Sequence, residues 1–189
     1  MFNDKYRLTQ AVLEGRKTQT RRIAYTGNAT IIDCGICVEP KNIGRATLFR
    51  GIDEIAHSRY CIGEEVAVSQ AYCDLVSNVG FNEEEINKLR CSKGWTNKMF
   101  VKADFMPHRI RITEIRAEHL QEISEEDCLA EGIVDFESRI NKAHFYSITD
   151  ESATYGTAKK PYSLFIDKIA GKGTWASNPY VFVYEFELI

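Results

Sequence analysis

The most apolar run of the chain lies at residues 180–188, Tyr-Val-Phe-Val-Tyr-Glu-Phe-Glu-Leu, and its first half is apolar on both faces. This is typical of a strand in the middle of a sheet or closing a barrel. In residues 110–116, Ile110, Ile112 and Ile115 stand among charged residues, close to the period of two of a half-buried strand. Both segments therefore predict strands, and the last one is expected to be central.

The segment 5–14 has a helical pattern instead. Leu8, Ala11 and Val12 are spaced i, i+3 and i+4, which places them on one face of a helix. Gly15 follows, and glycine readily adopts the left-handed conformation that ends helices. The pattern predicts a short amphipathic helix that stops at this glycine.

Two later helices are predicted from their ends. Ser124 is a good N-cap, and the acidic residues after it suit the positive end of a helix dipole. That helix is expected to end at Gly132. Pro161 opens another helix, which should end near Gly171 because a Gly-Lys-Gly sequence follows.

The remaining segments predict shorter elements. Residues 45–50 and 65–72 are apolar enough to be strands, whereas 24–44 is expected to be a loop or an irregular hairpin. An inserted loop with a short helix is expected near 74–97, with Asn82 as its N-cap and an acidic capping-box partner three residues later. The stretch of roughly 25 residues after Gly132 is expected to be loop-rich, a length that usually marks function or disorder.

Together these elements predict an α+β fold that is mainly β. Several short strands, few helices and a final apolar strand favour a small β-barrel with helices capping its ends, and an open α+β sheet is the alternative. A chain of 189 residues fits one domain, 1–189. Its loop insertions are expected at about 24–60, 74–100 and 134–160.

Composition narrows the class of protein. A net charge of −3 argues against a protein that coats nucleic acid through bulk electrostatics, although a local basic patch is compatible with it. No run approaches the roughly 18 apolar residues of a membrane span, and the first residues lack an apolar signal region. A cytoplasmic protein without a membrane partner is therefore expected.

The cysteines are expected to be reduced thiols in that compartment. They are Cys34, Cys37, Cys61, Cys73, Cys91 and Cys128. The first two form the only close pair, and a zinc knuckle would need a second pair at similar spacing. The sequence therefore predicts neither a metal site nor a cofactor.

The sharpest chemical feature is a basic segment that follows the helix-ending glycine. It contains four cations and two hydroxyl groups, namely Arg16, Lys17, Thr18, Thr20, Arg21 and Arg22. Guanidinium groups bind phosphate or carboxylate through paired hydrogen bonds, and threonine hydroxyls add neutral contacts. The alternative is a solvated basic turn without a ligand.

Lys17 is a candidate general base within this segment. The neighbouring arginines disfavour its ammonium form, so its pKa should fall if the side chain is partly desolvated. Lys17 and Thr20 are three residues apart, which is one face of a helical turn but opposite faces of a strand. A catalytic Lys–Thr pair therefore predicts a turn over residues 17–20.

Three other residues are candidates for the same site. Glu131 ends its predicted helix, where the dipole disfavours a carboxylate and so suits a proton donor; the alternative is a surface glutamate. Trp175 is placed to stack on a base or to join the core. Asn178 precedes Pro179, so it is expected to be extended and either to contact a ligand or to set up the last strand.

A second group of cations lies on the predicted strand near 110. Arg109, Arg111 and Arg116 would extend a basic face of the sheet. Strict alternation places Arg116 on the opposite face from the other two.

Four motifs in order carry a resemblance to a known family. Gly15-Arg-Lys-Thr-Gln-Thr-Arg-Arg22 resembles the Gly-x-Lys-Thr-x-Thr-x-Arg signature of ASCH domains, which are PUA-like small barrels. The other stretches are Ile62–Val68, Arg111–Gly132 and Trp175–Val183. The last two are most similar to the longer ASCH proteins of phages and prophages.

The resemblance implies a function for the basic segment. ASCH and PUA-like domains are associated with RNA binding, so RNA or a nucleoside or nucleotide is the implied partner, and the oligomeric state stays open. One branch of small ASCH proteins hydrolyses the acyl amide of N4-acetylcytidine with Lys, Thr and Glu, which match Lys17, Thr20 and Glu131. The alternatives are therefore a nucleoside-binding module, an amidohydrolase, and a phage accessory protein without a ligand. Ligand contacts would come from Arg16, Thr18, Arg21, Arg22, Trp175 and Asn178.

Overall fold

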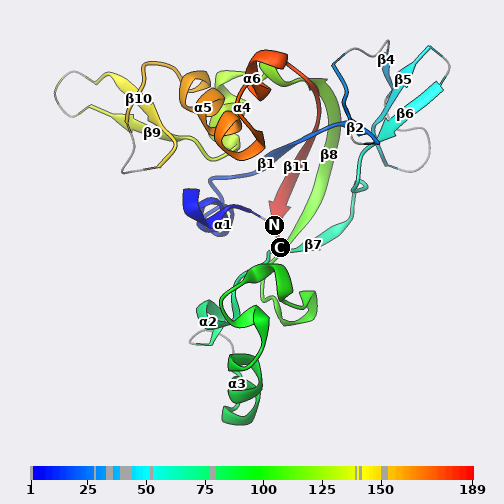
Figure 1. Cartoon of the computed structure of the whole chain (residues 1–189). Helices are drawn as coiled ribbons and strands as arrows, with labels where there is room; N and C mark the ends of the chain where they lie inside the picture. The colour runs from blue at the N-terminus through cyan, green and yellow to red at the C-terminus, as the bar shows by residue number, and fades with distance from the viewer. Residues whose placement is uncertain are drawn as a thin grey trace.

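The computed structural model describes residues 2–27, 29–32, 36–38, 44–51, 53–76, 80–138, 140, 142–149 and 153–189. Its centre is a curled antiparallel sheet that forms a half-barrel (Figure 1). The strands follow the order β1 (Gln19–Ile23), β11 (Tyr180–Leu188), β8 (Arg109–His119) and β7 (Glu65–Ala67). The fold is therefore α+β and mainly β, as the sequence predicts.

The last strand is central, as its two apolar faces predict. β11 pairs with β1 on one side and with β8 on the other. The run from Val181 to Tyr184 is buried throughout. β7 is shorter than the strand predicted for 65–72, because the chain turns into helix α2 (Tyr72–Leu75), where Tyr72 and Leu75 enter a separate apolar cluster.

A β-bulge changes which side chains share a face of β8. Phe186 pairs with Ile112 but Glu185 pairs with Glu114, so Thr113 is left over between them. The extra residue reverses the alternation, which places Ile112 and Ile115 together in the core despite their odd spacing.

The same bulge makes one expectation wrong. Arg111 reaches Glu187 at 3.2 Å and Arg116 reaches Glu185, two residues away on β11. Residues two apart on a strand share a face, so Arg116 lies on the same face as Arg111 and not opposite to it.

Smaller sheets flank the half-barrel. The predicted irregular hairpin is β2 (Tyr25–Thr26) with β3 (Ala29–Thr30), and beside it lies a three-stranded sheet. Its strands are β4 (Ile36–Val38), β5 (Thr47–Arg50) and β6 (Asp53–His57). The stretch after Gly132, expected to be loop-rich, contains one short hairpin in which β9 (Val134–Glu137) pairs with β10 (His144–Ser147). The alternating apolar side chains of this hairpin were too few to identify it.

The helices follow the predicted termini closely. α3 (Glu83–Arg90) has the capping box of Asn82 and Glu85, and α4 (Glu125–Ala130) starts at a Ser124 cap. α5 (Lys159–Ala170) begins two residues before Pro161 and stops at Gly171, and it is followed by α6 (Thr174–Ser177). None of the helices described has the length and apolar character needed to cross a membrane.

The first predicted helix is divided in two. A 3-10 turn (Asp4–Tyr6) is separated from α1 (Leu8–Leu13) by Arg7, whose φ is 52°. The predicted apolar face of α1 is nevertheless buried, and Gly15 has the expected positive φ of 72°. The break turns the N-terminal segment across the edge of the half-barrel, where it meets β1.

Two apolar cores hold the molecule together. The larger lies between the sheet, α1 and α5. The smaller consists of Tyr72, Leu75, Leu89 and Met106, in a helical lobe that extends below the sheet (Figure 1). The lobe spans about residues 72–106 and contains most of the predicted 74–100 insertion.

Candidate functional site

The basic segment runs into the edge strand of the half-barrel, and burial alternates along it. Lys17, Gln19 and Arg21 are buried, whereas Thr18 and Arg22 are exposed and Thr20 is half-buried. Since strand residues alternate between faces, Lys17 and Thr20 lie on opposite faces. The turn that a Lys–Thr pair requires over 17–20 is therefore absent.

Lys17 is a buried cation with a complete set of acceptors. Its Nζ donates to the carbonyl oxygens of Gln19 and Glu131 and to the Glu131 carboxylate, each at 2.7 Å. Only 1% of the Lys17 side chain and 5% of the Glu131 side chain are exposed. Burial lowers the pKa of Lys17, and the Glu131 carboxylate opposes this. With three acceptors engaged, Lys17 acts as a donor here and presents no lone pair to Thr20.

Arg21 occupies the centre of a larger ionic network. Its guanidinium reaches Glu118 at 2.7 Å, Asp127 at 2.6 Å and Glu131 at 3.4 Å, and also donates to the side chain of Gln19. Burial opposes its charge, but the surrounding carboxylates, Glu131 first, raise the pKa of Arg21 above its ordinary value. Arg21 is thus a structural cation rather than a group that faces a ligand.

Arg116 completes this network from β8. It pairs with Glu185 at 2.5 Å, Asp127 at 2.8 Å and Glu118 at 3.1 Å. The ionic network then comprises three cations and four carboxylates, namely Lys17, Arg21, Arg116, Glu118, Asp127, Glu131 and Glu185. Each is hydrogen-bonded to an opposite charge, which is the condition under which buried charges are tolerated.

Because of this network, the free energy of unfolding should fall as the pH becomes acidic. Burial acts against the Asp127 carboxylate, but its hydrogen bond and charge pairing with Arg21 outweigh burial and lower its pKa. A depressed carboxyl pKa stabilises the fold at neutral pH, and this contribution is lost as the pH falls below about 4. We expect Asp127→Asn to flatten the fall in the free energy of unfolding between about pH 5 and pH 3. Denaturant titrations across that range measure it. The exposed residue Asp104 provides the control, and an equal flattening in Asp104→Asn would contradict the assignment.

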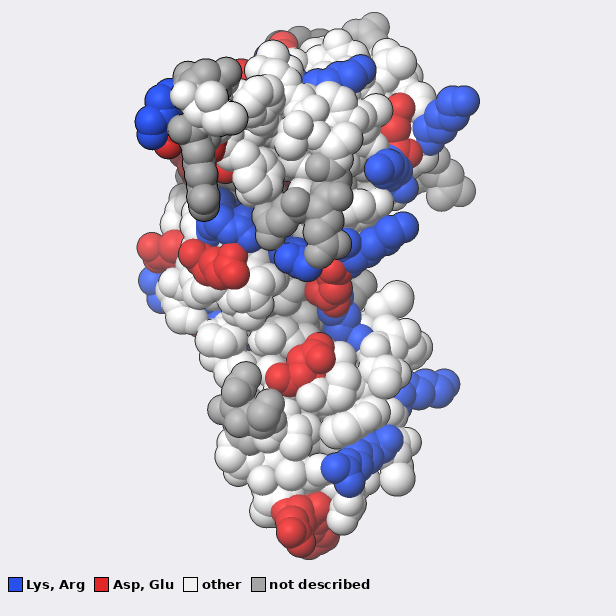
Figure 2. Space-filling view, turned by 90° about the vertical axis from the view of Figure 1, so that its left-hand side faces the viewer, with Lys and Arg blue, Asp and Glu red and all other residues white. Residues whose placement is uncertain are grey.

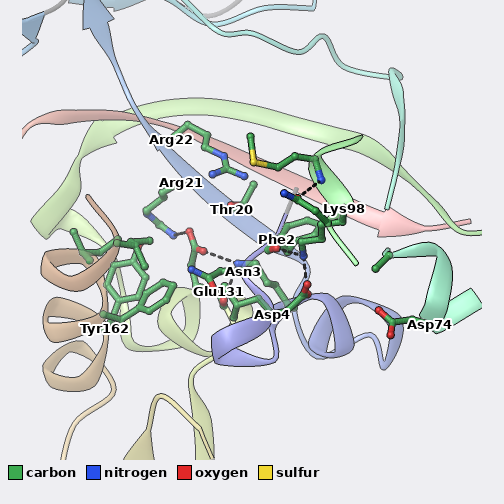
Figure 3. Close-up of a pocket in the computed structure, with 18 of the residues that line it drawn as sticks. Phe2, Asn3, Asp4, Thr20, Arg21, Arg22, Asp74, Lys98, Glu131 and Tyr162 are labelled. Carbon is green, nitrogen blue, oxygen red and sulfur yellow. Dashed lines mark hydrogen bonds and ion pairs between the residues drawn. The ribbon is translucent and has the colours of Figure 1, made fainter. Parts of the chain in front are cut away.

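A cleft opens along the edge of β1 beside this network. It has a volume of about 640 Å³ and is bounded by the N-terminal segment with α1, residues 71–74 and 96–99 of the helical lobe, and α5. We call it the β1 cleft. Lys17, Thr20 and Glu131 all line it, and Figure 3 shows Thr20 and Arg22 on β1 and Arg21 directed toward Glu131. A hollow of this size is in the range of small-molecule sites.

Lys98 joins two walls of the cleft. Its ammonium group donates to the carbonyl of Phe2, to Asp4 at 2.6 Å and to Thr9 at 2.9 Å (Figure 3). These bonds attach the helical lobe to the N-terminal segment. The width of the β1 cleft is consequently fixed by a charged contact.

Tyr162 on α5 is the most unusual group in the cleft. Its side chain is 1% exposed, and its hydroxyl has no hydrogen-bond partner among the residues that the structure describes. Burial, followed by the charge of Glu131, raises the pKa of Tyr162 well above its ordinary value, so it is a neutral donor. Buried polar groups almost always have a partner. Tyr162 is also one of the residues that line the β1 cleft.

Several predicted ligand contacts lie elsewhere. Trp175 packs against the core, with its ring 6.2 Å from that of Tyr162. Asn178 adopts a left-handed conformation, φ 45°, where an extended one was expected, and its side chain accepts from the backbone N–H of Gln121. Neither residue lines the β1 cleft. Trp175 lies in α6 and Asn178 at its C-terminal end, shortly before β11.

Arg16 and Thr18 also fall outside the cleft lining. Arg16 is exposed and pairs with Glu14 at 2.8 Å. The backbone N–H of Thr18 donates to Ala130, and its side chain is exposed. Of the predicted site, the cleft therefore brings together Lys17, Thr20, Arg21, Arg22 and Glu131.

Sequence reasoning missed the roles of Tyr162, Arg116 and Asp127. A signal existed for the ionic network, because the cations of residues 16–22 are matched by a helix start rich in acids at 125–127. No signal marked Tyr162, since it stands on the apolar face of a helix.

Figure 2 shows Lys and Arg mixed with Asp and Glu over the face that it presents, without one continuous basic area. No cluster of three metal-ligating side chains occurs within the described ranges. The Cys34–Cys37 pair falls outside this comparison, because Cys34 is not among the described residues.

Comparison of the chain with models of protein families, with curated proteins and with solved structures finds no match.

Proposed function

We propose that the β1 cleft binds a nucleoside, free or as part of RNA. The observation that carries this proposal is that Tyr162 lines the cleft and that its hydroxyl, which is buried, lacks a partner among the described residues. A base or ribose offers oxygen and nitrogen acceptors at the scale of this hollow. The hydroxyl of Thr20, which is half-buried on β1, offers a second neutral contact in the cleft.

The charges around the cleft favour a ligand that is polar but largely neutral in its buried part. Lys17 pairs with Glu131 and Lys98 with Asp4, so these charges are neutralised within the protein. The exposed guanidinium of Arg22 lies on the same strand as Thr20. Its five N–H donors suit a phosphate attached to the nucleoside.

The fold gives the proposal additional support. The curled half-barrel carries the basic segment on its edge strand, which is compatible with the small barrel that the ASCH resemblance implies. We therefore retain the ASCH resemblance as part of this proposal. It rests on the four ordered sequence motifs together with this architecture.

Tyr162→Phe tests the binding site directly. Removal of one hydroxyl that bonds only to ligand should weaken nucleoside binding about tenfold. The same change should leave the free protein equally stable or raise its free energy of unfolding by about 1 kcal/mol, because an unsatisfied buried group is removed. Calorimetric titration with cytidine, N4-acetylcytidine and short RNA, together with denaturant unfolding, measures both effects.

Tyr72→Phe is the matched control. The Tyr72 hydroxyl is also buried, but it accepts from the backbone N–H of Lys102 at 2.8 Å in the second core. This variant should lose about 1 kcal/mol of stability and bind ligand normally. Equal affinity of wild type and Tyr162→Phe for every ligand would refute the proposed site.

Hydrolysis of an acylated nucleoside is the second candidate. It is favoured by one observation, that Lys17, Thr20 and Glu131 line a single cleft. In this reaction the Thr20 oxygen would lose its proton to a base and attack the acyl carbonyl, and the amine would leave with a proton. Water would then hydrolyse the Thr20 ester and release the acid. Lys17 would first have to give up a proton to serve as the base, since its three N–H bonds are engaged.

Chromatography of N4-acetylcytidine incubated with the protein tests this candidate. Thr20→Val keeps the side-chain shape and removes the hydroxyl, so turnover should disappear while the protein stays folded. Thr18→Val is the control, because Thr18 lies two residues away but outside the cleft. Absence of cytidine release by wild type, with ligand binding retained, would leave the binding function alone. Absence of both would favour an accessory protein without a ligand.

A further inference from the structure

A second hollow lies at the other end of β1. It has a volume of about 750 Å³ and is bounded by the β2 end of the hairpin, by β6 and the residues after it, and by β11 beneath. We call it the β2–β6 groove. Phe182 and Tyr184 of β11 form the floor of the groove, and both are also buried residues of the core.

Aromatic rings are presented to solvent in this groove. Tyr25 is 51% exposed, although it is a large and partly apolar side chain. Tyr60 is half-buried, and the guanidinium of Arg59 lies over its ring, 5.6 Å from the centroid. Flat exposed rings beside an arginine are the elements on which unstacked bases bind.

Hydrogen bonds hold the walls of the groove in place. The backbone N–H of Arg59 donates to the Tyr184 hydroxyl at 2.9 Å, and the rings of Tyr60 and Tyr184 are 5.4 Å apart. On the other wall, Thr26 donates to the carbonyl of Ile55 at 3.0 Å, which joins β2 to β6. The ring of Tyr60 and the two walls are therefore positioned in advance of any ligand.

Among the described residues that line the groove, two are arginines and one is a glutamate. Arg22 and Arg59 are both exposed, and Arg59 forms no ion pair within the part of the chain that the structure describes. Among the described residues of the lining, Glu54 is the one acid, and it contacts His57 at 3.1 Å. A polyanion with flat bases matches this combination, whereas Lys17 and Lys98 of the β1 cleft are paired with Glu131 and Asp4.

Arg22 is common to both hollows. We propose that the β2–β6 groove holds the nucleotides adjoining the one in the β1 cleft, so the natural ligand is a single-stranded oligonucleotide and not a free nucleoside. Arg22 contacts the phosphate between the two sites, Arg59 contacts the next, and Tyr25 stacks on a base. This inference rests on the proposed function and specifies its substrate class.

Binding of cytidine and of an RNA hexamer, measured by calorimetry and fluorescence anisotropy, tests the inference. We expect the hexamer to bind at least tenfold more tightly than cytidine. Tyr25→Ala should weaken hexamer binding about tenfold by removing one stacked base. Arg59→Gln should weaken it and reduce the slope of log affinity against log salt by about 0.7. Neither variant should alter cytidine binding.

Arg90→Gln is the matched control, because Arg90 is also exposed and lies over a ring, that of Trp95, at 5.7 Å in the helical lobe. It should bind the hexamer as wild type does. A DNA hexamer of the same sequence is measured alongside, and the groove variants should weaken it too, since stacking and phosphate contacts do not read the 2′-hydroxyl.

The outcomes separate the two proposals. Cytidine binding that depends on Tyr162, without any gain for the hexamer, would overturn the groove and leave the cleft. Hexamer binding that depends on Tyr25 and Arg59 but not on Tyr162 would support the groove and overturn the cleft. Equal competition by oligo-glutamate of the same charge would overturn the nucleic-acid assignment of the groove.

Discussion

Lys17→Met should destabilise the protein by about 3–5 kcal/mol. The substitution keeps most of the apolar stem and removes the ammonium group. It leaves the Glu131 carboxylate, of which only 5% is exposed, without its nearest cation, and two carbonyl oxygens without their donor. Glu131 then keeps only the longer contact to Arg21, at 3.4 Å, and a buried charge that has lost its main partner is among the most destabilising changes a core can undergo. Urea unfolding at pH 7 measures the loss.

The double variant Lys17→Met/Glu131→Gln shows whether the loss comes from charge. Removal of both partners of a buried ion pair is far milder than removal of one, because no charge is left unpaired. We expect the double variant to recover more than half of the stability lost in Lys17→Met. Additive losses in the two single variants would contradict the pairing, since residues in contact should show coupling.

Arg21→Met should have an effect of similar size, about 3–5 kcal/mol. Arg21 serves three carboxylates, those of Glu118, Asp127 and Glu131, and removing it leaves them close together with one cation fewer. The deficit relative to wild type should shrink as the pH falls from about 5 to about 3, since protonated carboxyl groups do not need a cation.

Arg21→Lys separates charge from geometry. Lysine keeps the positive charge but lacks the planar fork that reaches Glu118 through Nε and Nη2 at once. We expect it to recover only part of the stability lost in Arg21→Met. Complete recovery would mean that charge alone holds the network. Denaturant unfolding of wild type and both variants over the same pH range provides the comparison.

These two effects determine how activity experiments on this protein should be designed. A Lys17 variant that fails to turn over a substrate is also expected to be poorly folded, so loss of activity in it does not identify a catalytic base. Thr20→Val and Tyr162→Phe change single hydroxyl groups in the β1 cleft and leave the ionic network intact. They are therefore the informative variants.

Local sequence signals predicted the helices and the main strands well. The ends of α3, α4 and α5 follow from the Asn82 and Ser124 caps and from Gly171, because capping depends on residues within one turn of the helix end. The central position of β11 follows from apolar side chains on both faces. These features need no knowledge of distant residues.

The predictions that were wrong depended on distant partners. The bulge at Thr113 is set by pairing with β11, some seventy positions along the chain, and it moved Arg116 to the face of Arg111. The division between the 3-10 turn and α1 at Arg7 arises where the N-terminal segment crosses to the helical lobe through Lys98. Neither can be seen from periodicity in one segment.

The sequence by itself marked residues 15–22 as chemically special, and the resemblance to ASCH domains added Glu131 to Lys17 and Thr20. Only the tertiary structure decided their roles. Lys17 and Arg21 are directed into the protein because β1 alternates and α4 brings its acids onto the same face, so burial and charge pairing make them structural. Tyr162 lines the β1 cleft because α5 packs against this edge of the sheet. Burial and partner choice are properties of packed surfaces, and a single sequence segment does not contain them.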